Sequence, residues 1–302
     1  MFKKLLIGLG ALLLLAVLFL GFTLGPAHLQ IRDISPDLPS AVELSSLKDN
    51  QAGPAKIGYL TSSTQAVEEQ SLGHNTFVVE WANGNILLID LGMDEQVAIE
   101  FGELFETLLD ADPAVSNGAV ADLLGDDLAR VKGVAFTHLH QDHVQGIEPI
   151  CAARAQNVTA LHTSDQMTKH NLQTADQFEL LQESTCVDQK EVATASDFAA
   201  EFPGIGIYPL GGHTPGSTLF AIPVDGTLWL LSGDISNSKD ALLQNAGKGF
   251  MYSYLMVPED VDRLAQLRLW LTDLEQSGAA RVIVSHDANA LYESGMDRWQ
   301  GE

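Results

Sequence analysis

Three histidines and one aspartate occur within six consecutive positions, in the block His138-Leu139-His140-Gln141-Asp142-His143. The block follows directly after the apolar run Val131–Phe136, which is typical of a strand. Residues two apart in an extended chain project to the same side, so His138 and His140 can approach one ion. Imidazole nitrogen and carboxylate oxygen are ligands that Zn²⁺ accepts, and Fe or Mn also tolerates them. The block therefore predicts a metal site, and its ligands can serve two neighbouring ions.

Four shorter motifs contain further side chains of the same chemistry. They are Ile89-Asp90-Leu91-Gly92, Gly211-Gly212-His213-Thr214-Pro215-Gly216-Ser217, Ser232-Gly233-Asp234 and Ser285-His286-Asp287. A lone histidine such as His213 or His286 is more often structural than a ligand. The complete set of motifs favours metal binding over that alternative, although Asp90 taken alone also fits a turn after a strand.

These motifs resemble those of a known family. His-x-His-x-Asp-His is the signature of the metallo-β-lactamase superfamily, and the four shorter motifs occur in that family's order. The resemblance extends from about Asn75 to the C-terminus. It implies an α/β fold, a four-layer αββα sandwich, with the metal site at one edge of its two sheets.

The resemblance also assigns the ligands. The first ion would be bound by His138, His140 and His213, the second by Asp142, His143 and His286, and Asp234 would bridge both. Asp90 would accept a hydrogen bond from a ligand histidine and so fix its tautomer. The cofactors implied are two divalent metal ions, with zinc preferred and iron or manganese as alternatives.

Within the family, the resemblance is strongest to the lactonase-like branch, which includes N-acyl homoserine lactonases. The shared features are the Thr-His-Leu-His-x-Asp-His block, the Gly-His-Thr-Pro-Gly-Ser loop and the final His-Asp pair. The resemblance implies a dinuclear hydrolase in which a metal-bridging hydroxide attacks a small-molecule lactone or carboxylic ester. Asp142 is the expected catalytic residue, because it can bind a metal ion and also take part in proton transfer to the leaving group.

One position departs from the lactonase pattern. Those lactonases carry a tyrosine three residues after the bridging aspartate, where it contacts the substrate carbonyl, and this chain has Asn237 there. An amide can donate a similar hydrogen bond. Tyr252 and Tyr254 are further candidates for substrate contact, with surface packing as the alternative for each.

Other functions can be weighed against this interpretation. A thioesterase or a phosphodiesterase of the same fold would use the same ligands. A mononuclear iron oxygenase belongs to a different class, and dioxygenases of this fold use fewer of the ligands. Classical β-lactamases of this fold lack the bridging aspartate, so Asp234 disfavours that activity. The chain has 40 acidic and only 16 basic residues, which argues against nucleic-acid binding because phosphates are neutralised by Lys and Arg.

The elements that must position these side chains are visible as short runs bounded by Gly, Asn or Asp, as strands are. The predicted strands are Asn75–Trp81, Asn85–Ile89, Val131–Thr137, Val158–His162, Ile205–Leu210, Thr218–Ile222, Thr227–Leu231 and Arg281–Ser285. Two segments, Gln96–Leu109 and Pro258–Gln276, repeat apolar residues at helical spacing, and Pro258 suits a first helical turn. Among the histidines outside the motifs, we expect His74 and His162 to be structural, and His28 and His170 to be exposed.

The N-terminal residues differ in kind from the rest. Lys3 and Lys4 precede the uncharged apolar run Leu5–Leu24, which as a helix would just cross a hydrocarbon core of about 30 Å. The positive-inside rule keeps the lysines in the cytoplasm and places the rest of the chain outside. We expect a membrane anchor over residues 1–24, a tether and lead-in over 25–55 with a short helix near Ala41–Leu47, and the hydrolase domain over 56–302. Secretion after signal cleavage is the alternative.

The chain contains two cysteines, Cys151 and Cys186. They could pair in an oxidising compartment, and a free buried pair of thiols is the alternative. Neither cysteine lies among the predicted metal ligands.

Overall fold

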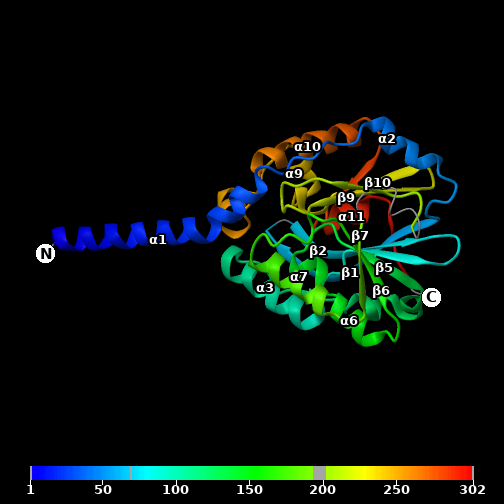
Figure 1. Cartoon of the computed structure of the whole chain (residues 1–302), viewed down its shortest axis with the longest axis horizontal. Coiled ribbons are helices and arrows are strands. Elements are labelled where there is room, and N and C mark those ends of the chain that lie inside the picture. The colour runs from blue at the N-terminus through cyan, green and yellow to red at the C-terminus, as the bar shows by residue number, and fades with distance from the viewer. Residues whose placement is uncertain (1, 69, 193–201, 301–302) are drawn as a thin grey trace.

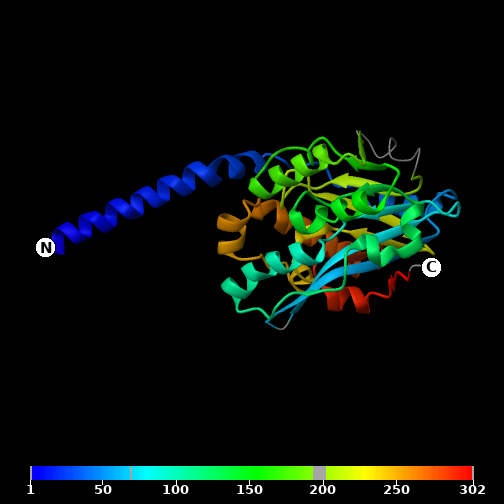
Figure 2. The ribbon, with the colours of Figure 1, turned by 90° about the horizontal axis from the view of Figure 1, so that it is seen from below.

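Two β-sheets face each other in the structure, a computed structural model that describes residues 2–68, 70–192 and 202–300. Helices cover the outer face of each sheet, so the layers follow the order helix, sheet, sheet, helix (Figure 1). One long helix, α1, projects from one end of these layers (Figures 1 and 2). The predicted αββα sandwich, preceded by one apolar helix, is confirmed.

The larger sheet has the strand order β12-β1-β2-β3-β5-β6-β7, and β4 pairs with β1 outside this path. Strands β1, β2 and β3 pair antiparallel, whereas β3, β5, β6 and β7 run parallel. The bounds are β1 Lys56–Val67, β2 Gln70–Glu80, β3 Ile86–Ile89, β4 Val115–Ser116, β5 Val131–Ala135, β6 Val158–His162, β7 Val187–Glu191 and β12 Asp297–Arg298.

The smaller sheet has the order β11-β10-β9-β8. Strands β8, β9 and β10 pair antiparallel, and β10 pairs in parallel with β11. The bounds are β8 Gly206–Pro209, β9 Thr218–Val224, β10 Thr227–Leu231 and β11 Arg281–Ile283.

Helices form the two outer layers (Figure 1). On the larger sheet lie α3 Glu95–Leu109, α4 Val120–Leu124, α6 Ile147–Ala153 and α7 Leu172–Glu183, and on the smaller sheet lie α2 Ala41–Ser46, α9 Lys239–Leu243 and α10 Val261–Gln276. The remaining helical elements are α1 Phe2–Ile31, α5 Gln141–Val144, α11 Ala288–Glu293, the 3₁₀ turns η1 Leu47–Asp49, η2 Gly125–Arg130 and η3 Gly233–Ile235, and the π-helical turn η4 Met251–Met256.

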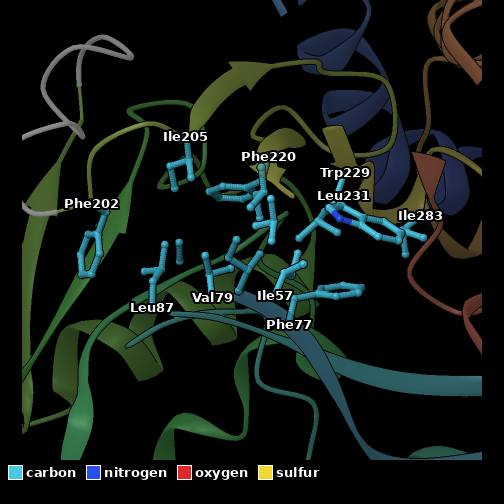
Figure 3. Close-up of a cluster of buried hydrophobic side chains, with 14 of the residues drawn as sticks. Ile57, Phe77, Val79, Leu87, Phe202, Ile205, Phe220, Trp229, Leu231 and Ile283 are labelled. Carbon is cyan, nitrogen blue, oxygen red and sulfur yellow. The ribbon is translucent and has the colours of Figure 1, made fainter. Parts of the chain in front are cut away.

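Alternation along the strands produces three apolar cores between the four layers. Phe77 and Val79 of β2 point into the core between the sheets, whereas Val78 points into the core under the outer helices. On the smaller sheet, Trp229 and Leu231 face the central core (Figure 3). Residues on the other face of their strand, β10, pack in the same apolar core as residues of α10. Packing of the two sheets against each other therefore fixes the positions of their strand ends relative to one another.

The predicted runs each contain or overlap a strand, and Gln96–Leu109 coincides with α3. Several elements differ from the prediction, among them α10 and β1. Helix α10 begins at Val261 rather than Pro258, because the Asp260 side chain accepts a hydrogen bond from the Arg263 N–H and caps the helix there. The first long strand, β1, was not predicted, because its buried residues include Thr61, Ser62 and Ser63 rather than an apolar series.

Helix α1 does not end where the tether was predicted to begin. It continues beyond Gly25 to Ile31, although Pro26 lies inside it. Ala27 is 5% exposed and Ile31 is fully buried, so packing against the domain offsets the one backbone donor that a proline removes. The segment Gly8–Ile31 is 24 residues long and apolar enough to cross a membrane. The short helix expected near Ala41–Leu47 is present as α2.

Cys151 of α6 and Cys186, which directly precedes β7, form a disulfide. Their Cα atoms lie 5.3 Å apart, and 35 positions separate them in sequence. Of the two alternatives left open by the sequence, the structure therefore contains the paired one.

Candidate metal centre and active site

The motif residues gather at one edge of the sandwich because each motif follows the end of a strand. Asp90 comes after β3, His138 and His140 after β5, His213 after β8, Asp234 after β10 and His286 after β11. Asp142 and His143 lie in α5, which begins directly after His140. The seven predicted ligands are all buried, with relative exposures between 0% and 9%.

The predicted ligands form overlapping groups, and Asp234 lies close to residues of each. His138, His140 and His213 form one set of atoms within 4.8 Å of one another, and His138, His143 and Asp234 form another. Oδ2 of Asp234 lies 3.6 Å from Nε2 of His213. Its Oδ1 lies 3.0 Å from Nε2 of His286 and 3.5 Å from Nε2 of His143. Asp234 thus turns one oxygen toward His213 and the other toward His143 and His286.

Two buried histidine nitrogens without hydrogen-bond partners also indicate that these residues bind metal ions. Nε2 of His138 and Nε2 of His143 are buried and have no hydrogen-bond partner among the described residues. Leaving a buried polar atom unsatisfied costs roughly 1–3 kcal/mol. Metal coordination would satisfy both nitrogens, and imidazole and carboxylate are suitable ligands for divalent ions such as zinc.

Asp90 lies behind His143. Its carboxylate accepts hydrogen bonds from the Thr137 N–H at 2.7 Å, the Thr137 hydroxyl at 2.8 Å and Nδ1 of His143 at 2.9 Å. The Nδ1 bond leaves Nε2 of His143 directed toward Asp234. Asp90 is fully buried and has a left-handed backbone, φ 58°, a conformation that Asp tolerates better than most residues.

Glu259 has the same relation to His213, and sequence analysis missed it. Its Oε1 accepts a hydrogen bond from Nδ1 of His213 at 2.6 Å and one from Lys248 at 2.9 Å, and its Oε2 accepts one from Ser253 at 2.6 Å. Burial would raise the pKa of Glu259, but Lys248 and the hydrogen bonds outweigh it and lower the pKa to about 2. In the sequence, Glu259 resembles an acidic residue at a helix start, so no local signal marks it.

His74, expected to be structural, lies at the metal centre. Its Nε2 is 3.9 Å from Oδ2 of Asp142, and its Nδ1 contacts the Ser63 hydroxyl at 2.9 Å. The ligand atoms of His74, Asp142 and His286 all lie within 4.8 Å of one another. Burial lowers the pKa of His74 to about 4. Its ring is therefore neutral at pH 7, and one ring nitrogen has a lone pair that can be donated to a metal ion.

The other histidines lie outside the ligand groups. His162 is half-buried and contacts the Thr163 carbonyl. His28 is half-buried rather than exposed. The expectation that His170 is exposed is wrong, because it is 7% exposed and its Nε2 contacts the Pro258 carbonyl at 2.9 Å.

Charges in the site are arranged so that the acidic groups remain ionised. Burial would raise the pKa of Asp234, but His286 and His143 outweigh it and hold the pKa well below its usual range. His143 and His286 likewise lower the pKa of Asp142 against the effect of burial. Burial raises the pKa of Tyr252 well above its usual value, and the nearby carboxylates act in the same direction. The phenol of Tyr252 therefore stays protonated.

A cavity of about 810 Å³ opens onto these groups, and Asp142, Asp234 and His286 line it. Asn237 and Tyr252, two of the predicted substrate contacts, also line the cavity. The third, Tyr254, does not. Its ring contacts the rings of His28 and Phe250, with centroid distances of 5.7 and 5.1 Å, and 39% of it is exposed.

A match to a family model shows which protein family the chain belongs to. The model of the metallo-beta-lactamase superfamily matches residues 71–286, a range that contains Asp90 and all seven predicted metal ligands.

The chain belongs to the metallo-β-lactamase superfamily.

Solved structures with the same fold agree with this membership. An N-acyl homoserine lactone hydrolase with the product N-hexanoyl-L-homoserine at its catalytic metal center is 14% identical, with a TM-score of 0.56, over 80% of this chain and 96% of that chain. AidC, a dizinc quorum-quenching lactonase, is 14% identical, with a TM-score of 0.53, over 78% and 89%. A probable metal-dependent hydrolase from Staphylococcus aureus is 16% identical, with a TM-score of 0.54, over 80% and 92%.

Comparison with curated protein sequences finds no match. For this member of the metallo-β-lactamase superfamily, the family and the buried His and Asp groups confirm the prediction of a metal-dependent hydrolase.

Proposed function

We propose that the protein is a dinuclear metal hydrolase that acts on a lactone or carboxylic ester. The observation that carries this proposal is the orientation of Asp234, whose two oxygens face two different histidine groups. One ion would be held by His138, His140 and His213, the other by Asp142, His143 and His286, with Asp234 shared between them. Zinc suits this donor set, and iron or manganese is an alternative.

When bound, two divalent ions supply an activated water and polarise the substrate carbonyl. Asp90 and Glu259 hold His143 and His213 by their Nδ1 atoms, which keeps Nε2 of each ring free for coordination. Asp142 lines the cavity as an ionised carboxylate. It can therefore accept a proton and pass it to the leaving-group oxygen.

Two side chains on the cavity wall can orient the substrate. The protonated phenol of Tyr252 lies beside His213, with the two rings stacked at a centroid distance of 6.5 Å. The amide of Asn237 lines the same cavity. Each can donate a hydrogen bond to a carbonyl or alkoxide oxygen. Tyr254 is the weaker of the three candidates because it lies outside the cavity.

We also propose that residues 1–24 anchor the protein in a membrane, with the domain of residues 56–302 exported. The Cys151–Cys186 disulfide supports an oxidising compartment. The burial of Ala27 and Ile31 supports an uncleaved anchor over a cleaved signal, because cleavage near these residues would remove side chains that pack against the domain.

The proposal is tested by turnover of the full-length protein in mild detergent after loading with zinc. Acyl lactones, carboxylic esters, thioesters, phosphodiesters and a β-lactam are compared by kcat/KM, and bound metal is measured. We expect two ions per chain, highest kcat/KM for lactones or esters, and loss of turnover in Asp142→Ala and Asp234→Ala. Higher kcat/KM for thioesters or phosphodiesters would assign the alternative substrate class, and full activity of Asp234→Ala would exclude the dinuclear mechanism.

A further inference from the structure

The membrane helix and the catalytic cavity share a wall. Phe22, Leu24 and Ala27 of α1 line the same cavity as Asp142, Asp234 and His286. Helix α3 contributes Leu104 and Leu108 to this wall, and η4 contributes Met256. In both views α3 and the segment around η4 lie at the end of the domain from which α1 projects (Figures 1 and 2). The cavity therefore lies beside the end of α1 that packs against the domain, which we call the root of α1.

Polar contacts fix the root of α1 in this position. Nε2 of His28 contacts the Tyr254 carbonyl at 3.1 Å. Oε1 of Gln30 contacts Nδ1 of His170 at 3.3 Å. Together with the buried Ala27, these contacts join α1 to η4 and to the loop before α7. The part of α1 that lines the cavity is thus held against the domain by these contacts.

Exposed apolar side chains occur on the three segments that wall the cavity, α1, α3 and the segment of Phe250 and η4, and we call them the apolar collar. Its members are Phe22 at 83% exposure, Leu104 at 45%, Leu108 at 56%, Phe250 at 65%, Met251 at 64% and Met256 at 39%. Four of them, Phe22, Leu104, Leu108 and Met256, line the same cavity, and exposed apolar surface gathered in one place marks an interaction site. Its contributors come from three elements far apart in sequence, so the collar is a product of the fold.

The geometry of α1 identifies what covers the collar. The apolar run Leu5–Leu24 is helical throughout and is therefore about 30 Å long, the thickness of a hydrocarbon core. With Lys3 and Lys4 at one membrane surface, Leu24 reaches the other surface, which is the level of the collar. A lipid bilayer crossed by α1 would thus contact the collar directly.

The cavity lining favours an acyl chain over an anionic headgroup. Its outer part is built from Leu, Phe and Met side chains of α1, α3 and η4. Among the described residues that line it, none is Lys or Arg, so a phosphate lying away from the metal centre would find no cationic side chain. The polar lining consists of predicted metal ligands and His74, of Asn171, Asn237 and Tyr252, and of Thr23, His170 and Gln173. The hydroxyl of Thr23, on the α1 wall, donates a hydrogen bond to the Phe19 carbonyl within the helix.

We propose that the active site takes its substrate from the bilayer: an amphiphile whose acyl chain lies along the wall of α1, α3 and η4 while its ester or lactone group reaches the metal centre. This inference rests on the proposed hydrolase function and specifies its substrate class. The bilayer contact of the collar places the mouth where such molecules are concentrated.

The first experiment compares chain lengths with the full-length, zinc-loaded protein in phosphatidylcholine vesicles. For a butanoyl-to-decanoyl lactone series, kcat/KM should rise at least about tenfold, because each buried methylene strengthens binding severalfold. In Leu104→Gln and Leu108→Gln, kcat/KM for the decanoyl substrate should fall about tenfold more than kcat/KM for the butanoyl substrate. Ile99→Gln, on the same helix and 43% exposed but outside the cavity lining, should match the wild type on both substrates.

A binding measurement separates failure of this inference from failure of the proposed function. Dansyl-undecanoic acid, a fluorescent fatty acid, should bind the zinc-loaded protein in competition with decanoate, and should bind Leu108→Gln more weakly than Ile99→Gln. Probe binding without turnover of any lactone or ester would contradict the proposed hydrolase function but support the acyl-binding site. Turnover that is independent of chain length, or absence of probe binding, would overturn the acyl site.

Contact with the bilayer has its own readout. Met251→Trp should be quenched by brominated phosphatidylcholine, because Met251 belongs to the collar. Tyr292→Trp, at a position on α11 that is 79% exposed and outside the cavity lining, should be quenched no more than the wild-type protein. Equal quenching of the two variants would show that the collar does not touch lipid.

Discussion

Oε1 of Glu259 accepts a hydrogen bond from Nδ1 of His213 over 2.6 Å, and 46 positions separate the two residues in sequence. The bond directs Nε2 of His213 toward Asp234 and His140. A carboxylate behind a ligand imidazole fixes its tautomer and raises its basicity. Glu259, just before α10, and Asp90, just after β3, thus support His213 and His143 from different parts of the fold.

Replacing Glu259 should therefore weaken metal binding without removing a ligand. In Glu259→Gln we expect metal affinity to fall by about 10–100-fold, the usual effect of losing such a partner. The measurement is competition with a chromogenic chelator. Ser253→Ala removes one hydrogen bond from Glu259 but keeps its charge on His213, so its affinity should stay near that of the wild type. Unchanged affinity in Glu259→Gln would refute the role.

Metal removal should destabilise the protein, because the two unpartnered histidine nitrogens then remain buried. Ligand binding at 1,000 times Kd stabilises a fold by about 4 kcal/mol, so chelation should lower Tm by several degrees and zinc should restore it. The titration should saturate at two ions per chain in the wild type and at one or fewer in Asp234→Ala. One iron per chain, with no second ion, would support the oxygenase alternative.

The disulfide should contribute to stability through the loop it closes. Cys151 and Cys186 are 35 positions apart, and closing a loop of this length restricts the unfolded chain by about 3–4 kcal/mol. Reductant should lower the free energy of unfolding by about this amount. The Cys151→Ser, Cys186→Ser double variant should be destabilised to a similar extent and should not respond to reductant. Two titratable thiols in native exported protein would contradict the pairing.

His170 should make stability depend on pH. Burial lowers its pKa to about 4 from 6.5, so the folded protein holds the ring neutral while the unfolded chain binds a proton more readily. Its contribution is therefore complete above pH 6.5 and is lost as pH falls through about 4. The shift corresponds to about 2–3 kcal/mol.

The check for His170 is denaturant unfolding of the wild type and His170→Gln in chelator, at pH 7 and pH 4. The wild-type protein should lose more stability than the variant between these two values, by about 2–3 kcal/mol. Chelator keeps metal release from contributing to either curve. Equal losses would show that His170 is not held neutral by the fold.

Much of the architecture could be predicted from the sequence. The apolar runs before Asp90, His138 and Asp234 correspond to β3, β5 and β10, because strands bounded by turn residues leave a local signal. The His-x-His-x-Asp-His block predicted its metal site for the same reason, since its ligands are close in the chain. Strand β1 left a weaker signal, because its apolar buried residues Ile57, Tyr59 and Leu60 are followed by the buried polar run Thr61–Ser63, whose backbone pairs with β2 and β4 only after folding.

The sequence by itself therefore determined the family, the strands and the types of side chain that could bind metal. Only the tertiary structure decided that Glu259 and His74 join the site, that Asp234 turns its oxygens to different histidines, and that α1 walls the cavity. These relations join residues far apart in the chain. Their distances are set by how two sheets and their helices stack, and local sequence patterns do not record that stacking.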